Sequence, residues 1–327
     1  MTARYVISFR RTGLGDRLIC LGAAWRFARA TGRILVADWR FSRYSPDLTA
    51  NLFPLCFQPL PELAGVPLVG DERVGQLQLP RPRYPSLWDD EGLLAYPFRR
   101  PFDTLLSDRD AAVELIRAGR DVVAPTVVFD ACINDGLVLW QESRSFLGAL
   151  RPTPSVAAEV ASFRRERLGP GPLIGLHVRH GNGGDIMGHA PYWHSVEAAI
   201  ERCVRAVRLA RKQLQVTATV FLCTDSSEIE HALRKRLRRV VCRPKSFRPK
   251  GAGELHWWRG AYQGRDDALI EMLLLAECDA LIRYPRGSFF SFYAAVMKPS
   301  RGVPPTTVYE LQHPCDPADP LSPALLL

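Results

Sequence analysis

The chain has 327 residues, of which 47% are hydrophobic and 24% charged, a composition typical of folded globular proteins and not of disordered segments. This length exceeds what one compact core usually serves, so we expect two domains. The formal net charge is +9, and such an excess attracts phosphate on a nucleotide, a nucleic acid or an anionic membrane. Part of the excess lies in Arg234–Arg239, a run that a solvated helix end would also carry.

The sequence shows neither a membrane-spanning nor a signal-peptide pattern. No run of about 18 uncharged apolar residues occurs, as a transmembrane helix would need. The N-terminus enters a strand-like run with Arg10 and Arg11 close behind, and it lacks the apolar core of a signal peptide. The eight cysteines are scattered without a C-x-x-C pair, which favours reduced core thiols over disulfides or a zinc site. We therefore expect a cytoplasmic protein without stable membrane insertion.

The first half begins with the β-loop-α-β pattern of a parallel sheet. Tyr5–Ser8 and Ile34–Ala37 are predicted strands, and the spacing of apolar residues predicts a helix over Asp16–Ala30 that stops at Gly32. Residues 44–96 are rich in proline and typical of loops that line a site. Val122–Phe129 is predicted as a further apolar strand.

The second half repeats the α/β alternation. The proline-flanked stretch Arg151–Gly171 marks the expected boundary, so we assign the domains to residues 1–160 and 161–327. Strands are predicted at Leu173–His177, Thr217–Cys223 and Ala280–Arg283, and helices at Val196–Lys212, Ile229–Leu237, Asp266–Glu277 and Ser288–Val296. The expected fold class is α/β with two Rossmann-like domains.

The stretch from Ile174 to Asp185, Ile-Gly-Leu-His-Val-Arg-His-Gly-Asn-Gly-Gly-Asp, carries the most chemical information. Its buried strand ends in His177 and Arg179, whose side chains point the same way because they are two residues apart. An arginine there is suited to bidentate contact with a phosphate. The glycine-rich loop that follows lets backbone approach a ligand closely. The alternative is an arginine that pairs with a carboxylate at a strand end.

Two later segments place polar groups beside apolar ones. Thr224-Asp225-Ser226 ends an apolar strand, and Asp225 or Ser226 would cap the next helix, with a role in fixing the site equally open. On the helix Asp267–Cys278, Glu271 lies among apolar residues, where a carboxylate is costly to bury unless it is paired or bound to a donor. A guanine edge offers two N–H donors to such a carboxylate. The alternative is an exposed glutamate on the outer face of the helix.

The segment Tyr284-Pro285-Arg286-Gly287-Ser288 joins a strand to a helix. Free backbone N–H groups and the dipole at a helix start form a ready anion site. Arg286 adds positive charge there. We interpret this segment as a phosphate contact in preference to a plain capped helix start.

Together these motifs resemble the rhizobial nodulation fucosyltransferases of the NodZ type, which are related to the eukaryotic α-1,6-fucosyltransferases of N-glycan cores. The resemblance rests on His-Val-Arg-His-Gly-Asn-Gly with a nearby Asp, on Phe-Leu-Cys-Thr-Asp-Ser, and on the Leu-Ile-Glu-Met helix that leads to Ile-Arg-Tyr-Pro. It extends to Arg10–Asp16, Asp38-Trp39-Arg40 and Phe129–Cys132, and so covers most of the chain in order. Relatives carry Asp where this chain has Glu271.

The resemblance implies a GT-B fold and an inverting transfer of L-fucose from GDP-β-L-fucose to the 6-hydroxyl of a reducing-end N-acetylglucosamine in a chitooligosaccharide such as a Nod factor. The N-terminal domain would be the acceptor side, and the C-terminal domain would bind GDP-fucose. Arg179 would contact the β-phosphate, His177 would lie beside the nucleotide, and the helix start at Ser288 would meet the phosphate. The implied donor-binding residues are His177, Arg179, His180, Asn182, Asp225, Glu271, Arg286 and Ser288, with Gly13, Gly15 and Asp16 in the N-terminal loop.

No metal or other cofactor is expected. Metal-dependent transferases hold Mg²⁺ or Mn²⁺ with Asp-x-Asp, and the one such triplet here, Asp108-Arg109-Asp110, is explained as helix-start acids. We assign stabilisation of the charge on the leaving phosphate to Arg179 and the Ser288 helix start, with Asp185 as the candidate catalytic base.

Two alternatives stay open. The first is a GT-B transferase that uses another nucleotide sugar or another acceptor. The second is a non-catalytic basic protein that binds carbohydrate or nucleic acid. The basic residues lack interleaved stacking aromatics, so we expect GDP-fucose and an oligosaccharide as partners and no nucleic acid.

Overall fold

The computed structural model describes residues 3–42, 44–45, 47–90, 114–115, 120–130, 140–181, 196–215, 217–249, 265–284, 288–297, 307–310 and 323–324. The chain divides into two compact units, Met1–Pro154 and Ser155–Leu327. Most of α6 (Pro154–Phe163) precedes the expected boundary at residue 160 but groups with the second unit. Within the described part of the chain, no helix has the length and apolarity needed to cross a bilayer.

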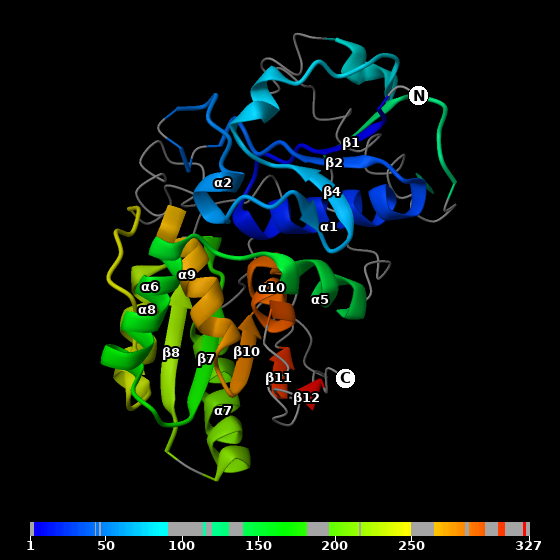
Figure 1. Ribbon diagram of the computed structural model, residues 1–327. Helices are drawn as coiled ribbons and strands as arrows, with labels where there is room; N and C mark the ends of the chain where they lie inside the picture. The colour runs from blue at the N-terminus through cyan, green and yellow to red at the C-terminus, as the bar shows by residue number, and fades with distance from the viewer. Residues whose placement is uncertain are drawn as a thin grey trace. The chain divides into compact units, whose positions relative to one another are not determined.

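Among its described residues, the first unit contains a six-stranded sheet in the order β3-β4-β2-β1-β6-β5 (Figure 1). The strands are β1 (Tyr5–Ser8), β2 (Ile34–Ala37), β3 (Glu62–Leu63), β4 (Val66–Val69), β5 (Arg83–Tyr84) and β6 (Thr126–Phe129). The β3–β4 pair is antiparallel and the other neighbouring pairs are parallel. The predicted β-loop-α-β opening is therefore confirmed.

The helix α1 (Leu14–Thr31) packs on this sheet (Figure 1). It begins two residues before the predicted start, because the capping position is Gly13, which offers no side chain to mark it. It ends as predicted at Gly32, whose φ of +64° lies in the left-handed region that glycine favours. The remaining described helices of this unit are α2 (Phe53–Cys56), η1 (Glu72–Gln76), η2 (Ser86–Asp89) and α5 (Trp140–Ala149).

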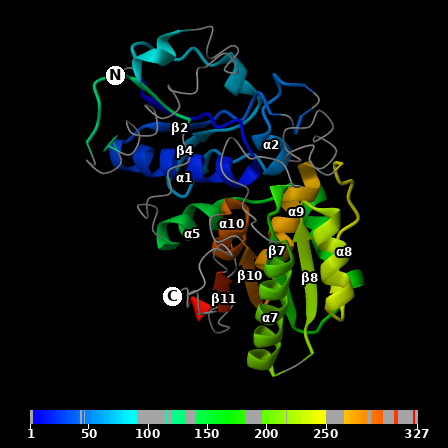
Figure 2. The ribbon, with the colours of Figure 1, turned by 180° about the vertical axis from the view of Figure 1, so that it is seen from behind.

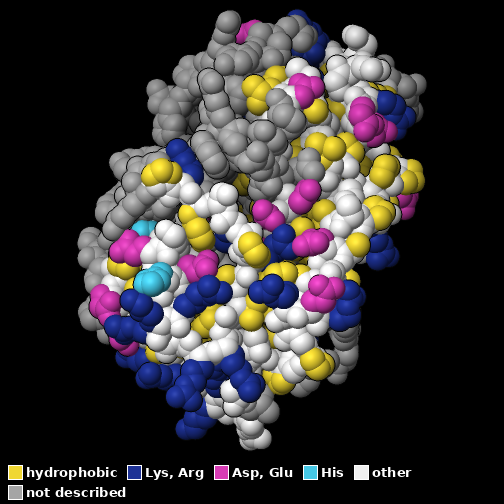
Figure 3. Space-filling model, turned by 90° about the vertical axis from the view of Figure 1, so that its left-hand side faces the viewer, with side chains coloured by type: hydrophobic (Ala, Val, Ile, Leu, Met, Phe, Trp, Pro, Cys, Tyr) yellow, Lys and Arg dark blue, Asp and Glu magenta, His cyan; other side chains and the backbone are white. Residues whose placement is uncertain are grey.

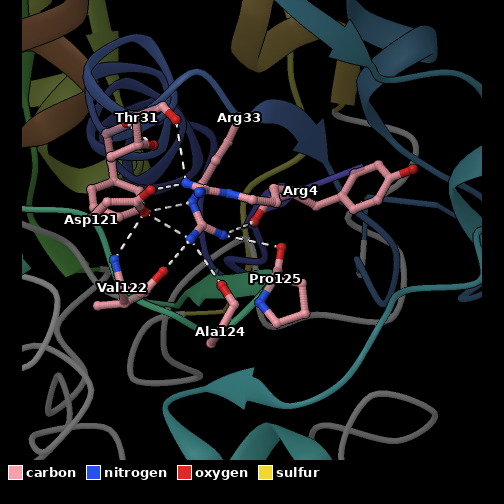
Figure 4. Close-up of polar contacts among 9 residues, drawn as sticks. Arg4, Thr31, Arg33, Asp121, Val122, Ala124 and Pro125 are labelled. Carbon is pink, nitrogen blue, oxygen red and sulfur yellow. Dashed lines mark hydrogen bonds and ion pairs between the residues drawn. The ribbon is translucent and has the colours of Figure 1, made fainter. Parts of the chain in front are cut away.

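A buried arginine at the amino end of this sheet shortens a predicted strand (Figure 4). The Arg33 side chain is fully buried, and its guanidinium donates to the Asp121 carboxylate at 2.8 Å. It also donates, at 2.8–3.1 Å, to the carbonyls of Val122, Ala124 and Pro125. The Pro125 carbonyl also accepts from the backbone N–H of Tyr5 in β1, whereas the Val122 and Ala124 carbonyls are bound by the Arg33 side chain. β6 begins at Thr126, so the prediction of a strand from Val122 is wrong in its first half.

The second unit holds a sheet in the order β12-β11-β10-β7-β8-β9 among the residues described there. The strands are β7 (Leu173–Val178), β8 (Thr219–Thr224), β9 (Val240–Val241), β10 (Ala280–Tyr284), β11 (Thr307–Glu310) and β12 (Pro323–Ala324). All neighbours are parallel except β11–β12. Taken in chain order, the parallel strands follow the 3-2-1-4-5 arrangement of a Rossmann fold.

Helices cover both faces of this second sheet (Figures 1 and 2). They are α7 (Val196–Leu214) and α8 (Ser227–Arg236) on one face, and α9 (Arg265–Ala276) and α10 (Phe289–Met297) on the other. A π-helix, η4 (Arg164–Leu168), follows α6. A Cβ on Gly175 of β7 would lie 2.9 Å from Leu275 of α9, so glycine permits the close contact of this strand and helix. The predicted elements of the second unit are thus confirmed to within a few residues.

The cysteines in the described part of the chain are buried free thiols, in agreement with the expected reduced core. They are Cys20, Cys56, Cys203, Cys223, Cys242 and Cys278. Burial raises the pKa of Cys203 to about 12, which keeps that thiol protonated and unreactive.

Candidate functional site

The strand order of the second unit reverses at β7. β8 lies on one side of β7 and β10 on the other. Ligands of open α/β sheets bind beyond the carboxyl ends of the strands at such a reversal. The backbone N–H of Arg179 donates to the carbonyl of Tyr284 at 2.7 Å. This bond extends the β7–β10 pairing past the end of β7 and fixes the start of the loop that follows.

His177 lies near the carboxyl end of β7, with its side chain buried. Its ring stacks on Phe290 of α10, with 5.1 Å between the ring centroids. Burial lowers the pKa of His177 well below its ordinary value, and the charges of Arg179, Arg283 and Lys245 lower it further. The imidazole is therefore neutral at physiological pH. Its Nδ1 atom is buried and has no hydrogen-bond partner within the described residues.

Asp225 joins the end of β8 to the loop after β7. Its carboxylate accepts hydrogen bonds from Nη1 of Arg179 at 2.8 Å and from the backbone N–H groups of His180 and Gly181 at 2.7 and 2.9 Å. Asp225 is 6% exposed, whereas the Arg179 side chain is 23% exposed. The arginine–carboxylate pairing that was the alternative to phosphate contact is therefore present. It leaves room for both roles, since a guanidinium carries five N–H donors.

Ser226, the neighbour of Asp225, caps α8. Its hydroxyl accepts a hydrogen bond from the backbone N–H of Ile229 at 3.4 Å. The sequence left open which of the two residues caps the helix and whether Asp225 also fixes the site. The structure divides these tasks, because the Asp225 carboxylate binds the loop after β7 and Ser226 binds the helix.

Arg283 on β10 is a further residue of the candidate site, and sequence reasoning did not select it. It is 2% exposed, and its guanidinium donates to the Ser291 hydroxyl at 3.2 Å and to the Ser288 carbonyl at 3.1 Å. These bonds fasten the start of α10 to the end of β10. Ser288 directly precedes α10, at the predicted helix start. The available signal was a cation at the end of an apolar strand, Ala-Leu-Ile-Arg, because a buried cation requires partners.

Glu271 of α9 is buried and paired. It is 7% exposed, so the alternative of a glutamate on the outer face of the helix is wrong. Its Oε1 lies 2.6 Å from Nζ of Lys245. Burial raises the pKa of Glu271, and Lys245 opposes that rise. Burial has the largest single effect on the pKa of Lys245 and lowers it, but the charge of Glu271, the hydrogen bond to it, and the charges of Cys223 and Asp225 together outweigh burial, so this pKa is raised.

Lys245 was also missed by sequence reasoning. It lies 26 positions before Glu271, on a segment after β9. The segment shows no helical or strand periodicity, so no local pattern indicates which way the lysine points. The fold alone brings it to α9.

Six predicted site residues lie on the elements around the carboxyl ends of β7, β8 and β10. They are His177, Arg179, His180, Asp225, Glu271 and Ser288. The predicted residues Asn182, Asp185 and Arg286, and the triplet Asp108–Asp110, lie outside the described residues. In the ranges that are described, no three His, Cys, Asp or Glu side chains are grouped so that they could hold a metal ion.

The other predicted residues belong to the first unit. Gly13 caps α1, and Gly15 and Asp16 lie in its first turn. The preceding loop is tied to the end of β6, because Arg10 and Arg11 lie 3.6 and 3.5 Å from the buried carboxylate of Asp130.

The chemistry of the second-unit site suits a polyanion. Arg179, Arg283 and Lys245 all act electrostatically on His177, which stays neutral. Asp225 and Glu271 hold two of these cations in place. Fixed cations at the switch point of a Rossmann sheet, next to a helix start, are the features that bind a nucleoside diphosphate.

Comparison with known proteins places these features in a family context. A family model described as Nodulation protein Z (NodZ) matches residues 2–303. Nodulation protein Z of Bradyrhizobium diazoefficiens is 38% identical over 301 residues, which cover 90% of this chain and 80% of that protein. Nodulation protein Z of Sinorhizobium fredii is 38% identical over 304 residues, which cover 91% and 92%.

Solved structures agree with the sequence relatives. The crystal structure of NodZ α-1,6-fucosyltransferase soaked with GDP-fucose matches with a TM-score of 0.77 and 32% identity, and the match covers 95% of each chain. The two Rossmann-like units of this chain are those of the GT-B fold.

Proposed function

Because the chain belongs to the NodZ family, we propose that it is a fucosyltransferase that uses GDP-β-L-fucose as its donor. It transfers L-fucose, with inversion, to the 6-hydroxyl of a reducing-end N-acetylglucosamine in a chitooligosaccharide of the Nod-factor kind. The second unit binds the donor, the first unit receives the acceptor glycan, and the reaction takes place in the cytoplasm.

The observation that carries this proposal is how the neighbouring residues hold the Arg179 side chain. Its guanidinium lies beyond β7 at the strand-order reversal, is bound through Nη1 by the buried Asp225, and keeps 23% of its side chain exposed. As GDP departs, negative charge grows on the β-phosphate. A cation that is already fixed stabilises this charge without reorganisation during the reaction. Since the Asp225 bond fixes the guanidinium before the donor binds, Arg179 is pre-organised for that role.

The nucleotide is assigned to the residues around Arg179. Neutral His177 adds a polar, uncharged surface beside the phosphates, and the start of α10 at Ser288 offers backbone N–H groups to them. Glu271 is the proposed guanine reader. Lys245 donates one hydrogen bond to its Oε1, and the remaining lone pairs of the two carboxylate oxygens are the acceptors we assign to the guanine N–H donors. The Lys245 charge also favours the ionised carboxylate that this contact needs.

The remaining chemistry is assigned to a general base and needs no metal. Inversion requires the acceptor hydroxyl to attack from the face opposite the departing GDP. A carboxylate then removes the hydroxyl proton, and Asp185, outside the described residues, is the proposed base. Arg179 and the α10 start supply the charge stabilisation that Mg²⁺ or Mn²⁺ supplies in metal-dependent transferases.

The test is a transfer assay with a defined product. The protein is incubated with GDP-fucose and a chitooligosaccharide, and the expected product gains one deoxyhexose at the 6-position of its reducing-end sugar, as established by mass spectrometry and linkage analysis. Faster transfer from another nucleotide sugar would overturn the donor assignment. GDP binding without transfer to any glycan would overturn the proposed reaction.

Arg179 is tested in the same assay. Arg179→Ala should lower kcat about 100- to 1,000-fold, the loss typical of one donor aimed at developing charge. Arg179→Lys should be nearly as poor, because it keeps the charge but loses the planar fork. Arg205→Ala, an exposed arginine on α7 of the same unit, is the matched control and should keep wild-type kcat. A folded Arg179→Ala enzyme with more than about a tenth of wild-type kcat would exclude Arg179 from the mechanism.

A further inference from the structure

More than half of the net positive charge of the chain is concentrated in one part of it. Residues 202–239 contain ten Lys and Arg against three Asp and Glu, and Glu197 and Glu201 in the first turns of α7 add two more acids. Ten minus five leaves an excess of five, out of +9 for the whole chain. The site described above draws no cation from this stretch. The excess charge therefore needs an explanation of its own.

The fold gathers this charge on one surface. Nη2 of Arg211, on α7, donates to the carbonyls of Ala218 and Arg238 at 3.1 and 2.6 Å. Arg239 donates to the carbonyl of Thr217. These bonds join the end of α7, the segment before β8 and the turn before β9. Figure 3 shows Lys and Arg side chains gathered at the lower end of the face that it presents.

Few of these cations are neutralised within the protein. Arg234 pairs with Glu230, and Arg236 pairs with Glu197 and Glu201. The other exposed cations have no acidic partner among the described residues, and we call them the basic surface. They are Arg205, Arg208, Lys212, Lys235, Arg238 and Arg239.

Helix ends do not account for the basic surface. Cations in the last turn of a helix are favoured by its dipole, which explains Lys212 on α7 and Lys235 on α8. Arg205 and Arg208 precede the last turn of α7, and Arg238 and Arg239 lie beyond the end of α8. Like charges so close repel one another, and this repulsion destabilises the folded chain unless an anionic partner screens it.

The position of the basic surface also separates it from the donor site. Ala218 immediately precedes β8, and Arg238 lies two residues before β9, so the basic surface lies at the amino ends of these strands. Arg179 and Asp225 lie at the carboxyl ends of β7 and β8. A partner bound to the basic surface would therefore leave the donor site of this unit open.

We propose that the basic surface docks the protein on an anionic phospholipid membrane. Clusters of four to eight Lys and Arg on an amphipathic helix are typical of binding to anionic lipid headgroups. Outward Arg205, Arg208 and Lys212 alternate on α7 with buried residues such as Ala206 and Val207. The stretch 202–239 contains one Phe, Tyr or Trp, which is Phe221, and it is fully buried. This stretch therefore offers no exposed aromatic side chain on which the bases of a single-stranded nucleic acid could stack.

The test is co-sedimentation with vesicles of phosphatidylcholine alone and of phosphatidylcholine mixed with phosphatidylglycerol. The protein should bind the mixed vesicles only, and added salt should release it. The variant Arg208→Gln/Lys212→Gln/Arg238→Gln should bind about 100-fold more weakly, since each basic residue near such a surface contributes about fivefold. All three side chains are exposed, so its transferase activity in solution should match wild type, and its melting temperature should equal or exceed that of wild type because repulsion on the basic surface is relieved.

A matched control removes three exposed arginines of the first unit, as Arg120→Gln/Arg144→Gln/Arg151→Gln. It has the same net charge as the test variant and should bind mixed vesicles like wild type. Equal binding by test variant and wild type, equal weakening in both variants, or binding to neutral vesicles would overturn the proposal. Tighter binding to duplex DNA than to mixed vesicles at the same ionic strength, lost in the test variant alone, would instead assign the surface to nucleic acid.

Discussion

Asp225 is predicted to act on the reaction through Arg179. Asp225→Asn preserves the shape of the side chain but replaces a two-oxygen acceptor with one oxygen and one NH2 group. Three donors converge on the native carboxylate at 2.7–2.9 Å, from Arg179, His180 and Gly181. In asparagine only the amide oxygen accepts hydrogen bonds, because the NH2 group is a donor. At least one of the three donors therefore loses its partner.

The magnitude follows from these bonds. A buried donor without a partner costs about 1–3 kcal/mol, and we expect the free energy of unfolding to fall by about that amount. If the freed guanidinium no longer meets the phosphate, kcat should fall by up to about 100-fold, or about 2.7 kcal/mol of transition-state stabilisation. KM for GDP-fucose should change much less, because the charge that Arg179 stabilises grows only in the transition state.

The assay is a double-mutant cycle of kcat with Asp225→Asn and Arg179→Ala, singly and combined. If Asp225 acts through Arg179, the double variant should be no slower than Arg179→Ala, which gives a coupling energy of about 2.7 kcal/mol. Ser226→Ala is the matched control, because it removes the neighbouring cap of α8 at about 1 kcal/mol of stability and should keep wild-type kcat. Multiplied losses in the double variant, or a folded Asp225→Asn enzyme with normal kcat, would refute the reasoning.

Three further predictions concern the need for a metal, the recognition of the guanine base, and the pH dependence of stability. Transfer should persist in excess EDTA, and activity that chelator abolishes and Mn²⁺ restores would contradict the metal-free mechanism. Glu271→Ala should weaken binding of GDP far more than of UDP, by about 1.5–3 kcal/mol for each lost bond to the charged acceptor; calorimetry that finds equal small losses would remove Glu271 from base recognition. Since burial holds the pKa of His177 below its unfolded value of about 6.5, its contribution to stability is complete above that pH and is lost as the pH falls below it. Thermal melts should show a smaller acid destabilisation in His177→Gln than in wild type, and identical pH profiles would speak against a buried neutral imidazole.

The central strands of both sheets, and the polar residues chosen for the candidate site, could be predicted from local sequence. The short strands at the sheet edges, such as β3, β5, β9 and β12, gave no such signal. A strand buried on both faces is a continuous apolar run, so a polar residue at its end is conspicuous. His177, Arg179 and Asp225 were selected in this way, and their roles stay predictions. Glu271 was found by the same contrast on a helix. Its burial is confirmed, and its role at the guanine stays a prediction.

What the sequence could not indicate depends on contacts between distant segments. The partner of Glu271, Lys245, comes from a segment without periodicity. The carbonyls of Val122, Ala124 and Pro125 are bound by Arg33, about 90 positions earlier in the chain. A propensity pattern records which residues are apolar, not which side chain will reach a backbone from elsewhere. For this reason the apolar pattern extended the predicted strand four residues before the start of β6, over a segment where Arg33 binds the carbonyls of Val122 and Ala124.

The net charge of the chain illustrates why a total is a poor guide to function. The sequence suggested that the excess of positive charge attracts phosphate, without distinguishing a nucleotide from a membrane. In the folded chain two of the cations near the proposed phosphate position are paired, Arg179 with Asp225 and Lys245 with Glu271, so these two add nothing to the excess. The excess lies instead on the basic surface at the other end of the same sheet. Binding of a small anion needs a few fixed cations whose neighbours are balanced, whereas attraction to an extended anionic surface needs unbalanced charge. The chain contains both kinds of positive charge, and the total of +9 reflects mainly the unbalanced charge of the basic surface.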